Sequence, residues 1–324
     1  MKTIDNLQIL RAFAAINVAI LHLIATASAY GFEPIYIGIL KGWGNNGVDI
    51  FFVLSGFIIL HTQLQKKRTL FEFLKLRIIR VIPIYWFVSL ILIFCYLIFP
   101  SNAFNSTMPS IDHILKSLFF ISGVNSGSSV PIVGVGWTLE LEMLFYLIFG
   151  LSLFFTQWNK SYIFILLFLL IFILTTSNII LIEFLFGMFI AIVFNTLQLQ
   201  NRYGFLIASI GFLFLLTSIN NLNNLYLNRV IIWGIPSSMI IFGLAYAKQY
   251  DQRLLKYLGD ASYSIYLVHA FLISAFYKFI TLLSFSINFD ILALICLIVT
   301  IIFGSAIYSF VEKPLTVFIR SKLS

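Results

Sequence analysis

The chain has 324 residues, of which 61% are hydrophobic and only 10% charged, and its mean hydropathy is +1.03. Soluble domains carry about 25% charged residues, so this composition excludes a soluble globular protein and predicts a polytopic membrane protein. The net charge of +8 does not indicate a nucleic-acid binder, because the basic residues lie between apolar runs. Two cysteines within apolar runs and four scattered histidines offer neither a disulfide framework nor a paired metal motif, so no metal site is expected.

The apolar runs predict an all-α bundle of about ten transmembrane helices, because a spanning helix needs about 20 mostly apolar residues. The predicted spans are residues 8–28, 46–63, 80–99, 132–156, 161–177, 179–197, 204–219, 230–247, 262–283 and 289–311. The first run imitates a cleavable signal peptide, but Arg11 and His22 interrupt its apolar core, so we interpret it as a retained helix. No internal repeat or soluble extra domain is visible, and we expect a single domain over 1–324.

The lysines and arginines predict the orientation of these spans. With the N-terminus inside, most of them fall on the cytoplasmic side, and only Lys41, Lys116, Arg229 and Lys278 fall outside. The positive-inside rule therefore predicts that both termini are cytoplasmic. The longest outer loop joins the third and fourth spans, and its residues 111–121 have the pattern of an amphipathic helix lying on the membrane.

The first span, which contains LRAFAAINVAILH at residues 10–22, carries Arg11 and His22 on nearly one face. Eleven residues separate them, which is about 20° around the helix and about 16 Å along it. Ionisable groups at such depth usually have a function. The alternative is that Arg11 reaches the lipid headgroups and His22 makes one hydrogen bond to a neighbouring helix.

The start of the second span, NNGVDIFFVLSGFII at residues 45–59, contains Asp49 and the pair Ser55-Gly56. Asp49 has two interpretations, a functional carboxylate or one that satisfies free backbone donors in the first turn of the helix. Ser55-Gly56 favours close helix packing over nucleophilic chemistry, because the strand-turn-helix context of a nucleophile elbow is missing.

The third span begins with FLKLRIIRVIPIYW, residues 73–86, in which Arg77 and Arg80 share one face at the predicted cytoplasmic end. The planar guanidinium suits phosphate, so with Lys75 they form a candidate anion site. Anionic lipid headgroups are the alternative partner. Pro83 is expected in the first turns of this helix, where proline is tolerated.

The fourth span, with GVGWTLELEMLFYLIFG at residues 134–150, places Glu142 near the bilayer midplane, at the expected depth of His22. A carboxylate there is either protonated or paired with a base, and a histidine–glutamate pair is a common way to orient a base. Glu140 points about 200° away around the helix. We interpret Glu183 and His61 as structural.

The ninth span opens with LGDASYSIYLVH, residues 258–269. Ser262, Tyr266 and His269 share one face of this helix at spacings of four and three. They are candidates for lining a cytoplasm-facing cavity, and the alternative is hydrogen bonding to neighbouring helices.

Six motifs, in this order along the chain, give it a resemblance to integral-membrane acyltransferase family 3, closest to its exopolysaccharide-production branch. They are QILRAFAAINVAILH, NNGVDIFFVLSGF, RIIRVIPIYW, GWTLELEMLFY, LGDASYSIYLVH and VEKPL. Any one of them is weak, but six in the same order are a specific signal. The resemblance extends from the first helix to the last.

The resemblance implies transfer of an acyl group, usually acetyl, from cytoplasmic coenzyme A thioester to a hydroxyl of a cell-surface sugar or its lipid-linked precursor. The arginine–ten residues–histidine motif of the family falls on Arg11 and His22. The arginine pair of the family falls on Arg77 and Arg80. Its tryptophan–glutamate element falls on Trp137 and Glu142. Acetyl-CoA is then a co-substrate, and no tightly bound cofactor is expected.

The residues and the resemblance together predict a site. Three arginines, Arg11, Arg77 and Arg80, hold the phosphates of coenzyme A. His22 is the general base and Glu142 orients it, whereas a transiently acylated His22 is the second-ranked route. The predicted substrate-binding residues are Asp49, Trp137 and His269.

The expected location is the inner membrane, with the lipid bilayer, acyl-CoA and a glycan acceptor as partners and no nucleic acid. A homo-oligomer and polysaccharide-assembly partners stay open. A transporter or flippase for a sugar or lipid-linked glycan is the main rival, since it too would carry ionisable residues at the midplane. Against it, the sequence has no duplicated halves. A structural scaffold is the third alternative, and it leaves the deep His22 and Glu142 without a reason.

Overall fold

The computed structural model describes residues 4–98, 109–123, 130–155, 158–176, 178–220, 229–283 and 288–323. All elements of this part are helical, which confirms the all-α prediction. The α-helices are α1 (Asp5–Ala29), α2 (Asn46–Gln65), α3 (Leu70–Ile98), α4 (Ile111–Leu118), α5 (Trp137–Ser152), α6 (Trp158–Thr176), α7 (Ile182–Thr196), α8 (Asn201–Thr217), α10 (Ile235–Tyr246), α11 (Arg253–Asp260), α12 (Ser262–Leu283), α13 (Phe289–Ile307) and α14 (Lys313–Leu323).

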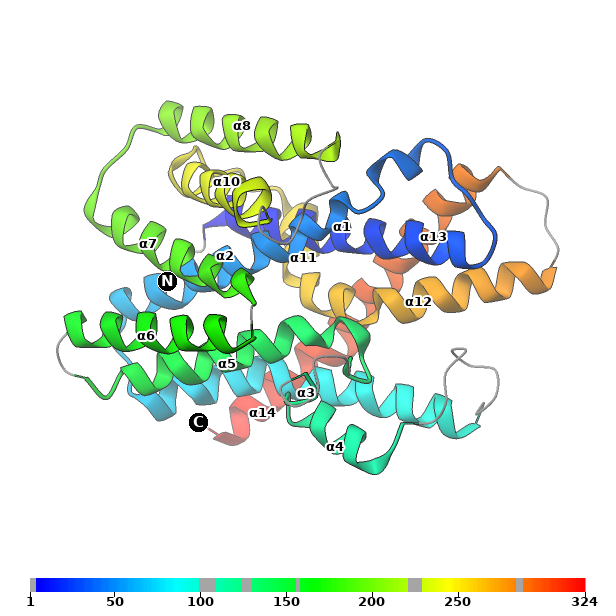
Figure 1. Cartoon of the computed structure of the whole chain (residues 1–324), viewed down its shortest axis with the longest axis horizontal. Helices are drawn as coiled ribbons and strands as arrows, with labels where there is room; N and C mark the ends of the chain where they lie inside the picture. Colours follow the sequence, from blue (N-terminus) through cyan, green and yellow to red (C-terminus); the bar gives the residue numbers. More distant parts are fainter. Residues whose placement is uncertain are drawn as a thin grey trace.

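The described helices are those of a multi-pass membrane protein. Seven are long and apolar enough to span a bilayer: Asp5–Ala29, Trp43–Gln65, Leu70–Ile98, Gly134–Ser152, Ile179–Thr196, Ser262–Leu283 and Phe289–Lys322. The other three predicted spans form shorter apolar helices, Ser161–Thr176, Asn201–Thr217 and Val230–Tyr246. The start of α1 and the end of α14 lie at the same end of the bundle (Figure 1). A count of ten spans and the cytoplasmic side of the termini stay predictions.

The third helix is longer than predicted. It begins at Leu70, ten residues before the predicted start, so Pro83 lies well inside it and not in its first turns. A capping box starts the helix: Thr69 Oγ1 accepts from the backbone N–H of Glu72 at 3.4 Å, and the Glu72 carboxylate accepts from that of Thr69 at 3.0 Å. As a result, Arg77 and Arg80 project from the body of a helix.

The last helix extends beyond residue 311, where the sequence analysis ended the last span. It continues from α13 through a π-helical segment, Tyr308–Glu312, into α14. Pro314 is the second residue of α14, where a missing N–H is tolerated. Such π-helical turns occur frequently at functional sites.

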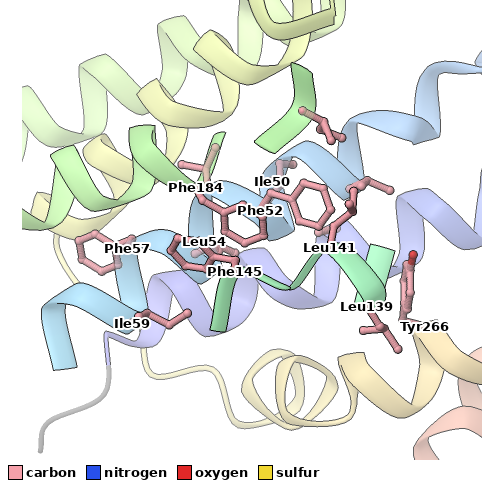
Figure 2. Packing of buried hydrophobic residues seen from close by; sticks show 14 of the residues in the cluster. Ile50, Phe52, Leu54, Phe57, Ile59, Leu139, Leu141, Phe145, Phe184 and Tyr266 are labelled. Atoms are coloured by element: carbon pink, nitrogen blue, oxygen red, sulfur yellow. The ribbon is translucent and has the colours of Figure 1, made fainter. Parts of the chain in front are cut away.

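Aromatic side chains fill the centre of the bundle where α2, α5 and α7 meet. Figure 2 shows Phe52, Phe145 and Phe184 packed against one another. The ring centroids of Phe145 and Phe184 are 4.2 Å apart, and those of Phe52 and Phe184 are 4.8 Å apart. Two glycines allow this approach: a Cβ at Gly56 would lie 2.1 Å from the Phe184 carbonyl oxygen, and one at Gly187 2.0 Å from that of Val53.

We therefore expect Gly56→Leu to destabilise the bundle by about 3 kcal/mol or more, because the new side chain clashes with backbone and forces α2 and α7 apart. The thermal unfolding temperature of the detergent-solubilised protein measures this. Gly134→Ala is the control, since its Cβ would meet Val130 at an ordinary 3.8 Å. Equal thermal unfolding temperatures of the two variants would contradict the packing role of Gly56.

Candidate active site

A narrow cavity of about 70 Å³ lies among α1, α2, α3, α5 and α12. Its polar lining consists of three cations from two helices, one carboxylate and five hydroxyl groups: Arg11, Arg77, Arg80, Glu142, Ser55, Thr138, Tyr146, Tyr263 and Tyr266. The structure therefore brings together the three predicted arginines and Glu142. We call this space the basic cavity.

The three arginines of the basic cavity form no ion pair with any carboxylate in the part of the chain that the structure describes. The Arg77 guanidinium carbon lies 5.3 Å from the centre of the Phe73 ring and 5.5 Å from that of Tyr146. Its Nε is buried without a hydrogen-bond acceptor among the described residues. Unpaired cations in a buried site favour an anionic ligand.

Glu142 does not contact His22, which corrects the predicted pair. Its Oε1 accepts hydrogen bonds from the hydroxyls of Ser55, at 2.7 Å, and Tyr146, at 2.5 Å. Hydropathy predicts how deep in the bilayer a residue of a helix lies. Which neighbouring helix its side chain faces depends on how the helices pack. Here packing turns Glu142 toward α2 and the basic cavity.

His22 instead lies against His269, with the two ring centroids 4.9 Å apart. His269 is fully buried and does not line the basic cavity, and its contact with a substrate stays a prediction. Tyr266 joins this pair to the basic cavity, because it lines the cavity and its ring centroid is 5.6 Å from that of His269. The Tyr266 hydroxyl is held by Thr138 Oγ1 at 2.7 Å and donates to the Val135 carbonyl at 3.1 Å.

Asp49 is fully buried and is engaged by an arginine that the sequence analysis did not connect to it. Arg229 donates from Nε to Asp49 Oδ1 at 3.0 Å and from Nη2 to Oδ2 at 2.8 Å. The carboxyl group of Glu183 also interacts with Asp49. Asp49 is paired with Arg229 and does not line the basic cavity, and its role in binding the sugar stays a prediction.

Breaking this ion pair is expected to be costly. Asp49→Ala leaves the Arg229 charge largely buried without its partner, which destabilises a protein by about 3–5 kcal/mol. Thermal unfolding of the purified protein measures the loss, and Asp112→Ala is the matched control, since its pair with Lys116 is exposed and worth about 0–1 kcal/mol. Similar melting temperatures for the two variants would show that the Asp49 pair is dispensable.

Trp137 lines a second, wider cavity of about 710 Å³ between α3, α5 and α6. Arg77 and Tyr146 line both cavities, so the two adjoin. Glu140 also faces this second cavity, where its carboxylate accepts hydrogen bonds from the backbone N–H groups of Ser122, at 3.0 Å, and Gly123, at 2.9 Å. Glu140 thus anchors residues 122–123 of the segment between α4 and α5, in agreement with its predicted direction away from Glu142.

Two residues, one that lines the basic cavity and one near its arginines, were not predicted. Tyr146 follows Glu142 by four residues, a spacing that puts both on one helical face and that the sequence does contain. Glu312, from the π-helical turn, accepts a hydrogen bond from Ser264 at 2.5 Å and is close enough to Arg11 and Arg80 to interact with their charges. No local pattern reveals that contact, because it joins distant parts of the chain.

Fold and cavity define a multi-pass membrane protein with a buried, arginine-lined site. The chain belongs to the acyltransferase-domain family, whose model matches residues 4–310, and this confirms the resemblance seen in the six motifs. It is 38% identical over 113 residues to the exopolysaccharide production protein ExoZ of Rhizobium meliloti (strain 1021), a match that covers 34% of this chain and 35% of ExoZ. The chain thus matches about a third of the length of that relative. No solved structure matches it.

Proposed function

We propose that this protein is an O-acyltransferase of the inner membrane. It moves an acyl group, acetyl in the first instance, from cytoplasmic acyl-CoA to a hydroxyl of a cell-surface polysaccharide or its lipid-linked precursor. The observation that carries the proposal is the set of three arginines, Arg11, Arg77 and Arg80, that line one cavity and form no ion pair among the described residues.

Coenzyme A is an anion with several phosphate groups, and arginine binds phosphate through two parallel hydrogen bonds. In the proposal Arg77, Arg80 and Arg11 hold these phosphates, and the thin thioester arm extends along α1. The rise of 1.5 Å per residue places His22 about 16 Å from Arg11 along that helix. Acyl-CoA is thus a co-substrate, bound and released in each turnover.

The reaction that we propose needs one base and no metal. Neutral His22 removes the proton of the acceptor hydroxyl, and the hydroxyl oxygen forms a bond to the thioester carbonyl carbon. The carbon–sulfur bond then breaks, and the coenzyme A thiolate leaves with the proton that His22 had taken. In this step the Tyr266 hydroxyl, which lies between the basic cavity and the histidine pair, turns its proton from the Val135 carbonyl to the oxyanion and stabilises it.

Two observations, the similarity to ExoZ and the second cavity, support the proposed acceptor. The similarity to ExoZ supports an exopolysaccharide or its precursor as the acceptor class. The second cavity supports an acceptor site that adjoins the donor site, because it carries Trp137 and shares Arg77 with the basic cavity. Aromatic side chains such as Trp137 are well suited to an amphipathic ligand, since they combine apolar area with a polar N–H.

The test is transfer of radiolabel from acetyl-CoA to glycan in membranes that contain the protein. Polymeric and lipid-linked glycan from the native host are the two acceptors, and membranes without the protein are the blank. We expect label in glycan as an ester that mild alkali releases. Arg202→Ala is a matched variant that should transfer normally, because Arg202 is an exposed arginine outside the cavity. No transfer by the wild type to either acceptor would contradict the proposal.

A further inference from the structure

A carboxylate and three cations share the basic cavity without pairing. Glu142 lines this cavity together with the three arginines, and it is close enough to Arg11 and Arg77 to interact with their charges. No ion pair joins Glu142 to an arginine in the described part of the chain. Opposite charges attract strongly where the dielectric constant is low, so the structure must hold this carboxylate away from the arginines.

Two hydroxyl groups hold the carboxylate in place. Ser55 of α2 donates to Glu142 Oε1 at 2.7 Å, and Tyr146 donates to the same oxygen at 2.5 Å. Tyr146 follows Glu142 by four residues, so both side chains lie on one face of α5. All three side chains line the basic cavity. Hydrogen bonds to a charged group are the strong ones, and two of them on one oxygen fix the position of the carboxylate.

Tyr146 contacts the carboxylate through its hydroxyl and a cation through its ring. The guanidinium carbon of Arg77 is 5.5 Å from the centre of the Tyr146 ring and 5.3 Å from that of Phe73. The planes of the two rings are perpendicular, with 6.3 Å between their centres. A cation is attracted to the face of an aromatic ring. Such contacts position Arg77 without using its N–H donors, which stay available for an anion.

We infer that Ser55 and Tyr146 are positioning residues that keep Glu142 from neutralising the arginines, so that these cations bind the phosphates of the donor. The identity of that donor rests on the proposed function. A carboxylate that reached an arginine would compete with phosphate for the same N–H groups. Removal of the two hydroxyls releases the carboxylate, and the affinity of the basic cavity for anions falls. This role goes beyond the helix packing that the sequence favours for Ser55.

The test measures the Kd of the purified protein for two radiolabelled anions, acetyl-CoA and inorganic pyrophosphate. Pyrophosphate carries the phosphate charge without a thioester, so its binding does not depend on the transfer reaction. We expect Ser55→Ala and Tyr146→Phe each to raise the Kd for both anions about tenfold, because each removes one hydrogen bond to a charged group. The double variant should raise both Kd values about 100-fold.

Glu142→Gln is the rescue variant. Glutamine keeps the shape of glutamate but forms no ion pair, so adding it to the Ser55→Ala/Tyr146→Phe protein should return both Kd values to the wild-type level or below. A cavity that had only lost its packing would stay weak. Ser89→Ala is the matched control and should bind both anions like the wild type. It removes another buried hydroxyl, which donates to the Tyr85 carbonyl oxygen outside the basic cavity.

The outcomes separate this inference from the proposed function. Wild-type affinity for pyrophosphate in the double variant would overturn the inference, and so would a triple variant that binds as weakly as the double one. A wild-type protein that binds no pyrophosphate would overturn it as well. Rescue of pyrophosphate binding, together with no transfer of acetyl label to glycan by the wild type, would keep the role of Ser55 and Tyr146 and contradict the proposed function instead.

Discussion

Replacing His22 by alanine is expected to reduce kcat for acetyl transfer by 10²- to 10⁴-fold, the contribution of a general base. The KM for acetyl-CoA should change little, since His22 does not line the basic cavity in which the arginines lie. Initial rates of label transfer at several acetyl-CoA concentrations, in membranes with matched protein levels, separate the two parameters.

The control for this variant is His61→Ala. His61 is also a histidine within a predicted span, but it stacks on Phe57 and its Nδ1 accepts a hydrogen bond from Asn195 Nδ2 at 3.0 Å, away from the basic cavity. It should transfer label at the wild-type rate. Wild-type kcat in His22→Ala would make this histidine a packing residue and remove the base from the mechanism.

The helices were largely predictable because hydropathy is a local property. The ninth predicted span, residues 262–283, coincides with α12, Ser262–Leu283. The start of α3 was missed because charged residues end an apolar run without ending a helix, and the capping box Thr69–Glu72 was the local signal that marks the true start. Similarly, Pro314 is the second residue of α14 and Pro83 lies inside α3, and neither proline ends its helix.

The site was predictable where one helix carries the information and unpredictable where two helices must be placed against each other. The spacing of Arg77 and Arg80 put both on one face, and both line the basic cavity. The partner of Asp49, by contrast, is Arg229, 180 residues away, and that of His22 is His269. Such pairs depend on how packing rotates each helix, and close contacts such as Gly56 on Phe184 set that rotation.

Loss of the arginine pair is expected to disable the binding of the donor. A hydrogen bond to a charged group is worth about 1.5–3 kcal/mol, and about 1.4 kcal/mol is tenfold in affinity. Arg77→Ala and Arg80→Ala should therefore each raise the KM for acetyl-CoA about 10- to 100-fold, and the double variant should bind it too weakly to saturate. Saturation binding of radiolabelled acetyl-CoA to the purified protein measures the same loss without relying on turnover.

Lysine substitution separates charge from geometry at these positions. Arg80→Lys keeps the positive charge but loses the planar pair of donors, so we expect an affinity between those of the wild type and Arg80→Ala. Arg202→Ala, which removes an exposed guanidinium that donates to Tyr203, should bind acetyl-CoA like the wild type. Saturable binding of unchanged affinity in the Arg77→Ala/Arg80→Ala double variant would mean that the unpaired cations of the basic cavity serve another anion, such as a lipid headgroup.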